Sequence, residues 1–129
     1  MNPWLILFPR MVLKLFIVFI IIAMFSYPGS TYLDNLNPGY SFTCNFLSDL
    51  GRTMSFSGEV NFLSAQFFNM SIILAGGVFA LFYLHVWKVF SDGRQRVLAL
   101  GGSFFGVLGG LSLLGVGLTP ADLYLDRHI

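Results

Sequence analysis

A small set of polar and ionisable side chains interrupts a chain that is otherwise strongly apolar. Asn45, Ser48, Asp49 and Arg52 recur at three- and four-residue spacing, and Asp122 stands near the end of the chain. A carboxylate can bind a cation or exchange a proton, while amides, hydroxyls and a guanidinium can hydrogen-bond a polar ligand. Whether these groups act together depends on the elements that position them.

Three long apolar runs dominate the sequence, at about residues 11–27, 62–87 and 97–118. A helix needs about 20 mostly apolar residues to cross a bilayer. Of the 129 residues, 56% are hydrophobic and only 10% are charged, whereas a soluble domain carries about 25% charged residues. The sequence therefore predicts an all-α fold, a polytopic transmembrane helix bundle with three membrane spans that forms a single transmembrane domain over residues 1–129.

The composition also limits which partners the chain can bind and how it can be processed. A net charge of +1 gives no basic field for nucleic acid, so membrane lipid is the expected partner. Cys44 is the only cysteine, which excludes an internal disulfide. The segment 26–29 lacks a small-x-small cleavage site, which favours a retained first span over a secretory signal peptide.

Basic side chains predict the orientation of the spans. Five of the seven stand at the start of the first span or in the 88–96 loop, and two stand in the 28–61 loop and the 119–129 tail. Lys and Arg are enriched on the cytoplasmic side. We therefore expect a protein of the plasma or inner membrane with its N-terminus and the 88–96 loop in the cytoplasm, and the 28–61 loop and the C-terminus of this chain outside. The five are Arg10, Lys14, Lys88, Arg94 and Arg96, and the two are Arg52 and Arg127.

The second and third spans each carry a face that suits close helix packing. Gly102, Gly106 and Gly110 form two overlapping GxxxG repeats in the third span. Small residues let another helix approach closely, and amides within a membrane need partners, so both faces should look into a bundle. A substrate groove along the glycines is the alternative. The residues that share one face of the second span are Gln66, Asn69, Ile73, Gly76, Ala80 and Tyr83.

The outer loop contains a further helical pattern. Phe42, Phe46 and Leu50 recur at four-residue steps, and Gly51 follows as a natural helix end. We expect a short amphipathic helix that turns this apolar face to the membrane or the bundle. The opposite side would hold an ion pair across one turn. The polar residues of that side are Asn45, Ser48, Asp49 and Arg52, with the pair formed by Asp49 and Arg52.

The tail after the third span has the pattern of a helix start. Thr119 would cap a helix that begins at Pro120, and Asp122 would lie in its first turn. Asp126 shares the face of Asp122, and His128 lies off that face. These groups could ligate a divalent metal or act as acid and base, but no pair has the spacing of a named metal motif. We expect helix capping here, with no metal and no cofactor.

The chain ends at Ile129, soon after this predicted helix start. Three spans would also leave the amide face of the second and the glycine face of the third with few partners. We therefore expect either a homo-oligomer or further spans of the same protein, with this chain as an N-terminal fragment.

Two motifs resemble a known family. The stretch 45–53 contains Ser48-Asp49-Leu50-Gly51, and Asn61 and Asn69 follow in or beside the next span. This pattern resembles the DUF998 group of uncharacterised multi-spanning membrane proteins. It is also loosely similar to the DRAM-like autophagy-modulator membrane proteins. Proteins of this kind carry a Ser-Asp/Glu-Leu-Gly motif after their first helix.

The outer end of the third span extends the resemblance. Residues 119–122 with His128 are similar to a Pro-x-Asp…His stretch of the same group, so the likeness covers residues 11–129. It implies more spans than this chain supplies and brings no established activity. It also implies that the Ser48-Asp49 motif meets the Asp122/His128 segment on the outer face of one bundle.

The function that we expect first is an outward-facing polar pocket for a lipid headgroup or a small solute. Ionisable groups at membrane depth are costly, which makes them candidates for function. The residues expected to line the pocket are Asn45, Ser48, Asp49, Arg52, Asp122 and His128, with Gln66 and Asn69 beneath them.

Two other functions stay open at this point. A metal-assisted membrane hydrolase at the outer interface would draw on Asp49, Asp122, Asp126 and His128, although one histidine is few for zinc. A structural or assembly subunit would need the glycine stripe alone and no ligand. Because no complete catalytic motif is present, the sequence favours a protein that is not an enzyme.

Cys44 provides a direct test of the predicted orientation. A membrane-impermeant maleimide added to intact cells should label this single thiol, because the charge pattern places the outer loop outside. The measurement is the labelled fraction with and without permeabilisation. Labelling only after permeabilisation would invert the topology and move the candidate site to the cytoplasm.

Overall fold

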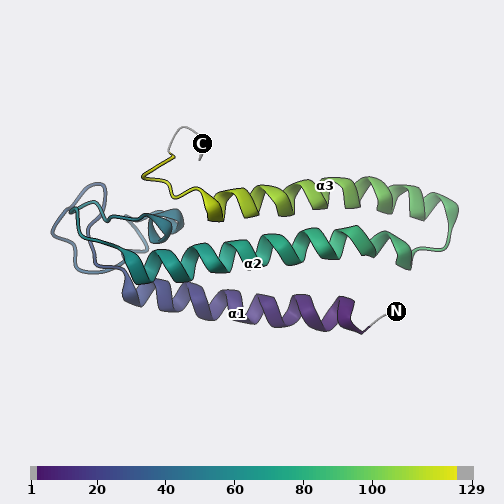
Figure 1. Cartoon of the computed structure of the whole chain (residues 1–129), viewed down its shortest axis with the longest axis horizontal. Helices are drawn as coiled ribbons and strands as arrows, with labels where there is room; N and C mark the ends of the chain where they lie inside the picture. The colour runs from purple at the N-terminus through teal and green to yellow at the C-terminus, as the bar shows by residue number, and fades with distance from the viewer. Residues whose placement is uncertain (1–2, 125–129) are drawn as a thin grey trace.

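The computed structural model describes residues 3–124 and shows three long helices packed side by side (Figure 1). Helix α1 comprises Trp4–Ser26, α2 comprises Phe62–Val86 and α3 comprises Gly93–Leu118. Within this described part of the chain, β pairing is limited to isolated bridges. The predicted all-α fold is confirmed.

All three helices are long and apolar enough to cross a membrane, over Ile6–Ser26, Phe62–Val89 and Gly93–Leu118. Two bounds differ from the prediction, because α1 starts well before residue 11 and α3 starts before residue 97. Pro9 lies inside α1. A proline removes one backbone hydrogen bond, and the apolar residues on both sides of it continue the helix.

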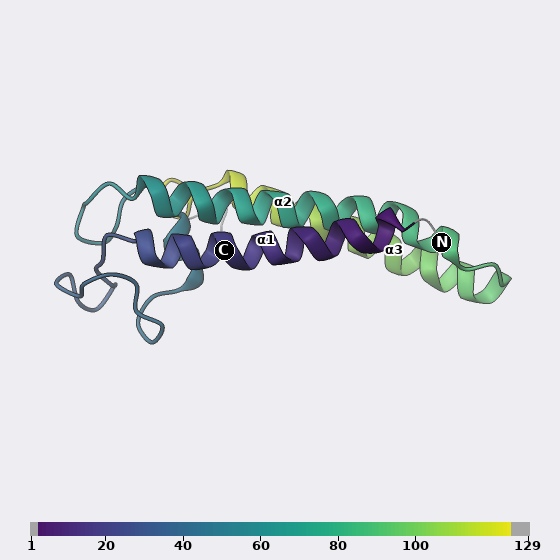
Figure 2. The ribbon, with the colours of Figure 1, turned by 90° about the horizontal axis from the view of Figure 1, so that it is seen from below.

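The connection between α2 and α3 is therefore shorter than the predicted 88–96 loop. The 3-10 helix η2, Trp87–Val89, extends α2, and α3 begins after Asp92. The carbonyl of Asp92 accepts the first α3 hydrogen bond, from the N–H of Arg96 at 2.8 Å. The two helices thus form one tight hairpin (Figures 1 and 2).

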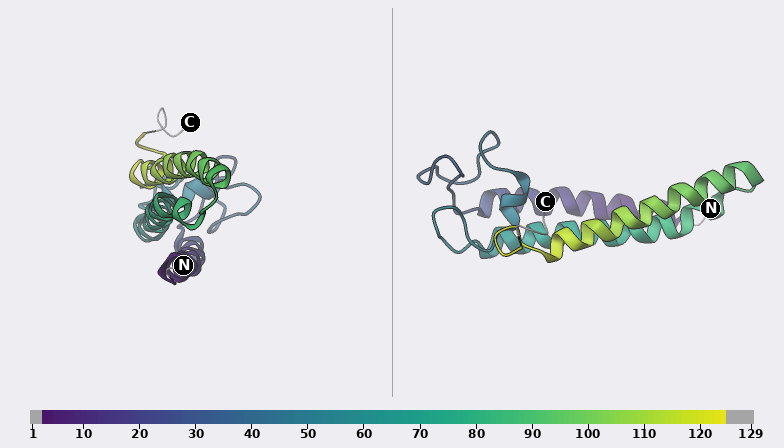
Figure 3. Two further views of the ribbon diagram at one scale, coloured as in Figure 1. Left: turned by 90° about the vertical axis from the view of Figure 1, so that its right-hand side faces the viewer. Right: turned by 90° about the horizontal axis from the view of Figure 1, so that it is seen from above.

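Helix α2 occupies the centre of the bundle and packs against both α1 and α3 (Figure 3). The buried apolar core lies toward the end of the bundle where α2 begins, and the outer loop contributes one fully buried side chain to it. Elsewhere α1 and α3 leave large apolar side chains exposed, as helices in contact with lipid do. The core residues are Ile20, Ala23, Tyr27, Leu50, Phe68 and Ile72.

Glycines bring the backbones of α2 and α3 into direct contact. A Cβ added to Gly110 would lie 2.6 Å from the backbone N of Ala80, and one added to Gly76 would lie 2.7 Å from the carbonyl oxygen of Gly110. A Cβ on Gly106 would overlap the ring of Tyr83. Gly102 is different, because a Cβ there meets nothing within 4 Å. Its predicted role in helix packing is therefore wrong for this bundle.

The amide face of α2 and the glycine face of α3 are thus partners of each other. Gly117 also abuts this face, since its Cβ would lie 2.7 Å from Cγ1 of Ile73 and 3.0 Å from the carbonyl oxygen of Asn69. The contact covers only part of each face, because Gln66 on the α2 face is exposed and a Cβ on Gly102 of the α3 face would meet nothing within 4 Å. A homo-oligomer or further spans of the same protein stay a prediction.

The two ends of the bundle differ in chemistry. The start of α1 and the α2–α3 hairpin lie at one end, while the outer loop and the segment after α3 lie at the other (Figure 1). The five basic residues named above stand at the first end and are exposed. Their shared location agrees with three antiparallel crossings, and which end faces the cytoplasm stays a prediction.

Neighbouring glycines provide a matched test of this packing. Gly110→Ala should destabilise the bundle by about 1–3 kcal/mol, because its Cβ meets backbone atoms that cannot rotate away. Gly109→Ala should have little effect, since a Cβ there meets nothing within 4 Å. The measurement is the helical circular dichroism of each variant during unfolding with dodecyl sulfate in mixed micelles. Equal stability of the two variants would contradict the contact.

Candidate functional site

The outer loop is held on α2 by side chains that donate to its backbone. The loop contains the 3-10 helix η1, Leu47–Gly51. Asn61 Nδ2 donates to the carbonyls of Leu50, at 3.1 Å, and Arg52, at 2.9 Å. Ser64 Oγ donates to the Leu50 carbonyl at 3.1 Å. Without these donors the buried end of η1 would leave carbonyl groups unpaired, at a cost of about 1–3 kcal/mol each.

Gly51 allows this close approach of the loop to α2. Its carbonyl accepts a hydrogen bond from Nδ2 of Asn69 at 3.3 Å. A Cβ on Gly51 would lie 2.5 Å from the ring of Phe68 and 2.6 Å from Oδ1 of Asn69. The glycine was predicted as a helix end, and the structure adds that its missing side chain makes room for α2.

The polar residues Asn45 and Asp49 point into the protein rather than away from it. Only 8% of Asn45 and 5% of Asp49 are exposed, whereas 79% of Phe42 and 75% of Phe46 are exposed. The predicted amphipathic helix is therefore wrong in two respects: the helical part is only η1, and Asn45 and Asp49 of its predicted polar side are buried, as Leu50 of its apolar side is.

Backbone hydrogen bonding explains this inversion. Asn45 Nδ2 donates to the carbonyl of Ser30 at 3.1 Å and to Asp49 Oδ2 at 3.2 Å. Asp49 Oδ2 also accepts from the N–H of Phe46 at 2.9 Å, and Asn45 Oδ1 accepts from the N–H of Ser41 at 3.0 Å. The two side chains organise an irregular loop, and exposed aromatic rings suit a membrane–water interface.

Two tyrosines share the environment of the buried Asp49. Burial, and then the negative charge of Asp49, raise the pKa of Tyr27 above its ordinary value. The same two causes raise the pKa of Tyr40. Both phenols therefore stay protonated at neutral pH and can act only as neutral hydrogen-bonding groups.

Asp122 ties the segment after α3 to the outer loop. Its carboxylate accepts hydrogen bonds from the N–H of Thr53 at 3.0 Å, from Thr53 Oγ1 at 2.5 Å and from the N–H of Met54 at 3.1 Å. Partial burial alone would raise the pKa of Asp122, but these hydrogen bonds outweigh it and hold the pKa below its ordinary value. The carboxylate is thus a charged clamp between two distant parts of the chain.

The structure describes the predicted helix start around Asp122 only as far as Tyr124, and residues 120–124 are not an α-helix in it. Pro120 instead begins a turn, in which its carbonyl accepts from the N–H groups of Leu123 and Tyr124 at 3.1 and 3.0 Å. Thr119 Oγ1 donates back to the carbonyl of Gly115 at 2.8 Å, in the last turn of α3. Asp126 and His128 lie outside the described residues.

The remaining predicted residues do not gather around one point. Ser48 is half-buried in η1. Arg52 does not pair with Asp49 within the described chain; its guanidinium lies 4.2 Å from the ring centroid of Phe56, and its Nε donates to the Met54 carbonyl at 3.2 Å. Asn45 and Asp49 form one polar group, and Asp122 belongs to another.

A polar cavity lies beside this second group, at the start of α2. Its volume is about 270 Å³. It brings together the exposed amide of Gln66, the half-buried amide of Asn69 and the side chain of Thr53, which also binds Asp122. Val60, Asn61, Phe62 and Ala65 complete the lining.

Asn61 gives this cavity a defined polarity. The residue is 1% exposed, and both of its Nδ2 bonds go to carbonyl oxygens, which can only accept. The amide must therefore point its nitrogen at the loop, and its Oδ1 has no hydrogen-bond partner among the described residues. Buried polar atoms of this kind are uncommon and call for an explanation.

Sequence reasoning missed three of the residues that build this site. Asn61 was noted only within the family resemblance, and neither Ser64 nor Thr53 was assigned a role. A signal was present, because Asn61, Ser64 and the predicted Asn69 recur at three- to five-residue steps at the start of the second span. Their partners are backbone carbonyls, which no side-chain pattern identifies.

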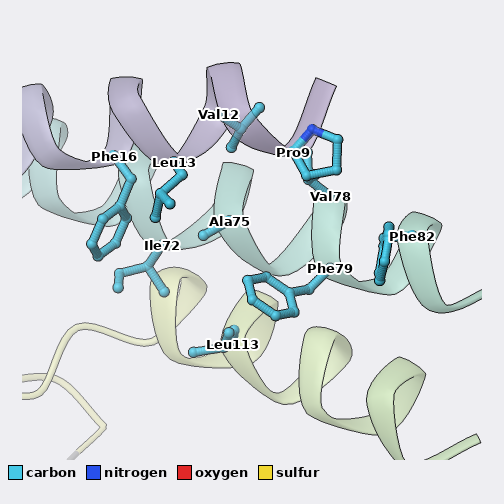
Figure 4. A pocket seen from close by; sticks show the side chains of 10 residues that line it. All are labelled: Pro9, Val12, Leu13, Phe16, Ile72, Ala75, Val78, Phe79, Phe82 and Leu113. Carbon is cyan, nitrogen blue, oxygen red and sulfur yellow. The ribbon is translucent and has the colours of Figure 1, made fainter. Parts of the chain in front are cut away.

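A second cavity lies within the membrane-spanning part and has a different character. It has a volume of about 320 Å³ and opens between α1 and α3, with α2 as its floor (Figure 4). None of the predicted site residues lines it. The lining is entirely apolar, and its residues are Pro9, Val12, Leu13, Phe16, Ile72, Ala75, Val78, Phe79, Phe82 and Leu113.

Comparison of the chain with family models, curated proteins and solved structures finds no match. The resemblance to the DUF998 group and to the DRAM-like proteins therefore stays a prediction. The fold and the outer site stand on the geometry of this chain alone.

The clamp formed by Asp122 predicts a pH dependence with a defined sign. Because the folded-state pKa lies below the ordinary value of 3.8, the clamp contributes fully above that pH and is lost as the pH falls further. Wild type should be more stable than Asp122→Asn at pH 7, and the difference should vanish in more acidic solution. The measurement is unfolding with dodecyl sulfate at stepped pH. A stability difference that is independent of pH would contradict a charged clamp.

Proposed function

We propose that this chain is an integral membrane protein whose outer polar cavity binds a lipid headgroup or a small solute that carries N–H or O–H donors. The observation that carries the proposal is the fixed orientation of Asn61, whose Oδ1 lacks a partner at a cavity lined by the amides of Gln66 and Asn69. A ligand that donates a hydrogen bond would satisfy this oxygen.

The charge beside the cavity narrows the ligand class. Asp122 is held in its charged form next to Thr53, and a negative charge disfavours an anionic group at short range. Arg52, the basic residue nearest in sequence, lies over the ring of Phe56, donates its Nε to the Met54 carbonyl and does not line the cavity. The arrangement therefore favours a primary ammonium or a polyol over a free phosphate.

The location of the cavity agrees with a headgroup ligand. It lies in the first turns of α2, where a span leaves the bilayer, and the exposed rings of Phe42 and Phe46 belong to the same end of the bundle. By the distribution of basic residues, this end faces away from the cytoplasm. The ligand then comes from the outer leaflet or from the space outside it.

The two other functions draw less support from the geometry. A hydrolase needs carboxylates that are free to bind a metal or a proton. Asp49 instead accepts hydrogen bonds from the N–H of Phe46 and from Nδ2 of Asn45, and Asp122 accepts from the N–H groups of Thr53 and Met54. No group of three or more potential metal ligands occurs among residues 3–124. An assembly subunit would use the glycine contacts, which this chain already satisfies within itself.

Headgroup chemistry provides the test. Phosphatidylethanolamine carries N–H donors and phosphatidylcholine has none, so the purified protein should retain more of the former in native mass spectrometry. Gln66→Leu should reduce this preference about fivefold, because the loss of one hydrogen bond costs about 1 kcal/mol of binding free energy. Asn35→Leu, which removes an exposed amide of the outer loop that does not line the cavity, is the matched control. A preference that is absent in wild type, or unchanged in Gln66→Leu, would contradict the proposal.

A further inference from the structure

A third cavity lies at the opposite end of the bundle, between the end of α2 and the start of α3. Its volume is about 340 Å³. Its walls are mainly apolar, formed by residues that include Val86, Phe90, Leu98 and Ala99. Gly102 also lines it, which explains why this predicted packing residue meets no neighbouring helix.

One buried polar group in this cavity has no partner. Ser103 lines the cavity and is 6% exposed, and its hydroxyl makes no hydrogen bond within the described residues. Unpaired hydroxyl groups at membrane depth are costly because water is scarce there. An ester carbonyl of a lipid drawn into the cavity would accept this hydrogen bond.

Basic residues stand next in sequence to a residue that lines the same cavity. Gln95 lines it, and Arg94 and Arg96 flank Gln95 in the first turn of α3. Lys88 and Arg96 lie over the ring of Trp87, with Nζ and Cζ at 5.7 and 4.9 Å from the ring centroid. This arrangement of an aromatic ring and cations at a helix end is suited to lipid phosphates.

We propose that this cavity binds an anionic phospholipid from the leaflet at the hairpin end. One acyl chain occupies the apolar cavity, and the phosphate lies against Arg94 and Arg96. Charge complementarity selects this occupant, because three cations and one acid, Asp92, stand in the segment 88–96. Guanidinium groups bind phosphate oxygens in a bidentate manner. A zwitterionic headgroup carries no net negative charge and should bind these cations less strongly than an anionic one. The site is independent of the outer polar cavity and would exist without it.

Trp87 reports directly on this site. In a Trp4→Phe background it is the one remaining tryptophan. The protein is placed in vesicles that contain an equal small fraction of either brominated phosphatidylglycerol or brominated phosphatidylcholine, and quenching of Trp87 fluorescence is compared. The anionic lipid should quench more strongly, and Arg94→Gln and Arg96→Gln should each reduce its preference about fivefold. Equal quenching by both lipids in the parent protein would overturn the proposal.

Two matched controls separate this site from general attraction to a charged surface. Arg10→Gln removes a basic residue at the same end but outside the cavity, and it should keep the preference. Gly102→Phe should fill the cavity and abolish the preference, while Gly101→Phe should not. Both glycines have open space where a Cβ would stand, so both variants should fold. An equal loss in Arg10→Gln, or no loss in Gly102→Phe, would overturn the assignment.

Discussion

The outer end of this bundle depends on one constraint: the backbone of the loop at Leu50–Arg52 lies against a membrane helix and must be hydrogen-bonded there. Asn61, Ser64 and Asn69 meet this requirement with side-chain donors. The amide orientation that results at Asn61 leaves its Oδ1 without a partner among the described residues, and Asn61 is one of the residues that line the outer cavity. The candidate site is thus a consequence of how the loop is anchored.

A second constraint acts along the bundle. Helices α2 and α3 touch through glycine backbones, so little space remains between their middle parts. Cavities occur instead at the two ends of the bundle and between α1 and α3 over α2. The two end cavities differ in charge, with Asp122 near one and the basic hairpin near the other. This difference in charge is the basis on which we propose two different sites, one for each leaflet.

The sequence predicted the parts of this fold that depend on hydropathy and helical period. The three spans, the shared face of α2 and the packing of Gly106 and Gly110 all follow from those patterns. The outer loop could not be predicted in the same way. Its apolar spacing indicated an amphipathic helix, but Asn45 and Asp49 are buried because they bind loop backbone, and burial of a polar group depends on partners that no periodicity records. The contact of Asp122 with Thr53 likewise joins residues 69 positions apart.

Hydrogen exchange at two backbone amides tests the central claim most directly. If the loop is anchored as described, the N–H groups of Thr53 and Met54 exchange slowly in lipid nanodiscs, because the carboxylate of Asp122 holds both. In Asp122→Ala they should exchange at the rate of an open loop, while the amides in the middle of α2 stay protected. Rapid exchange of Thr53 and Met54 in the wild-type protein would show that the loop is not held over the bundle. The loop would then not be held in the position in which Thr53 lines the outer cavity.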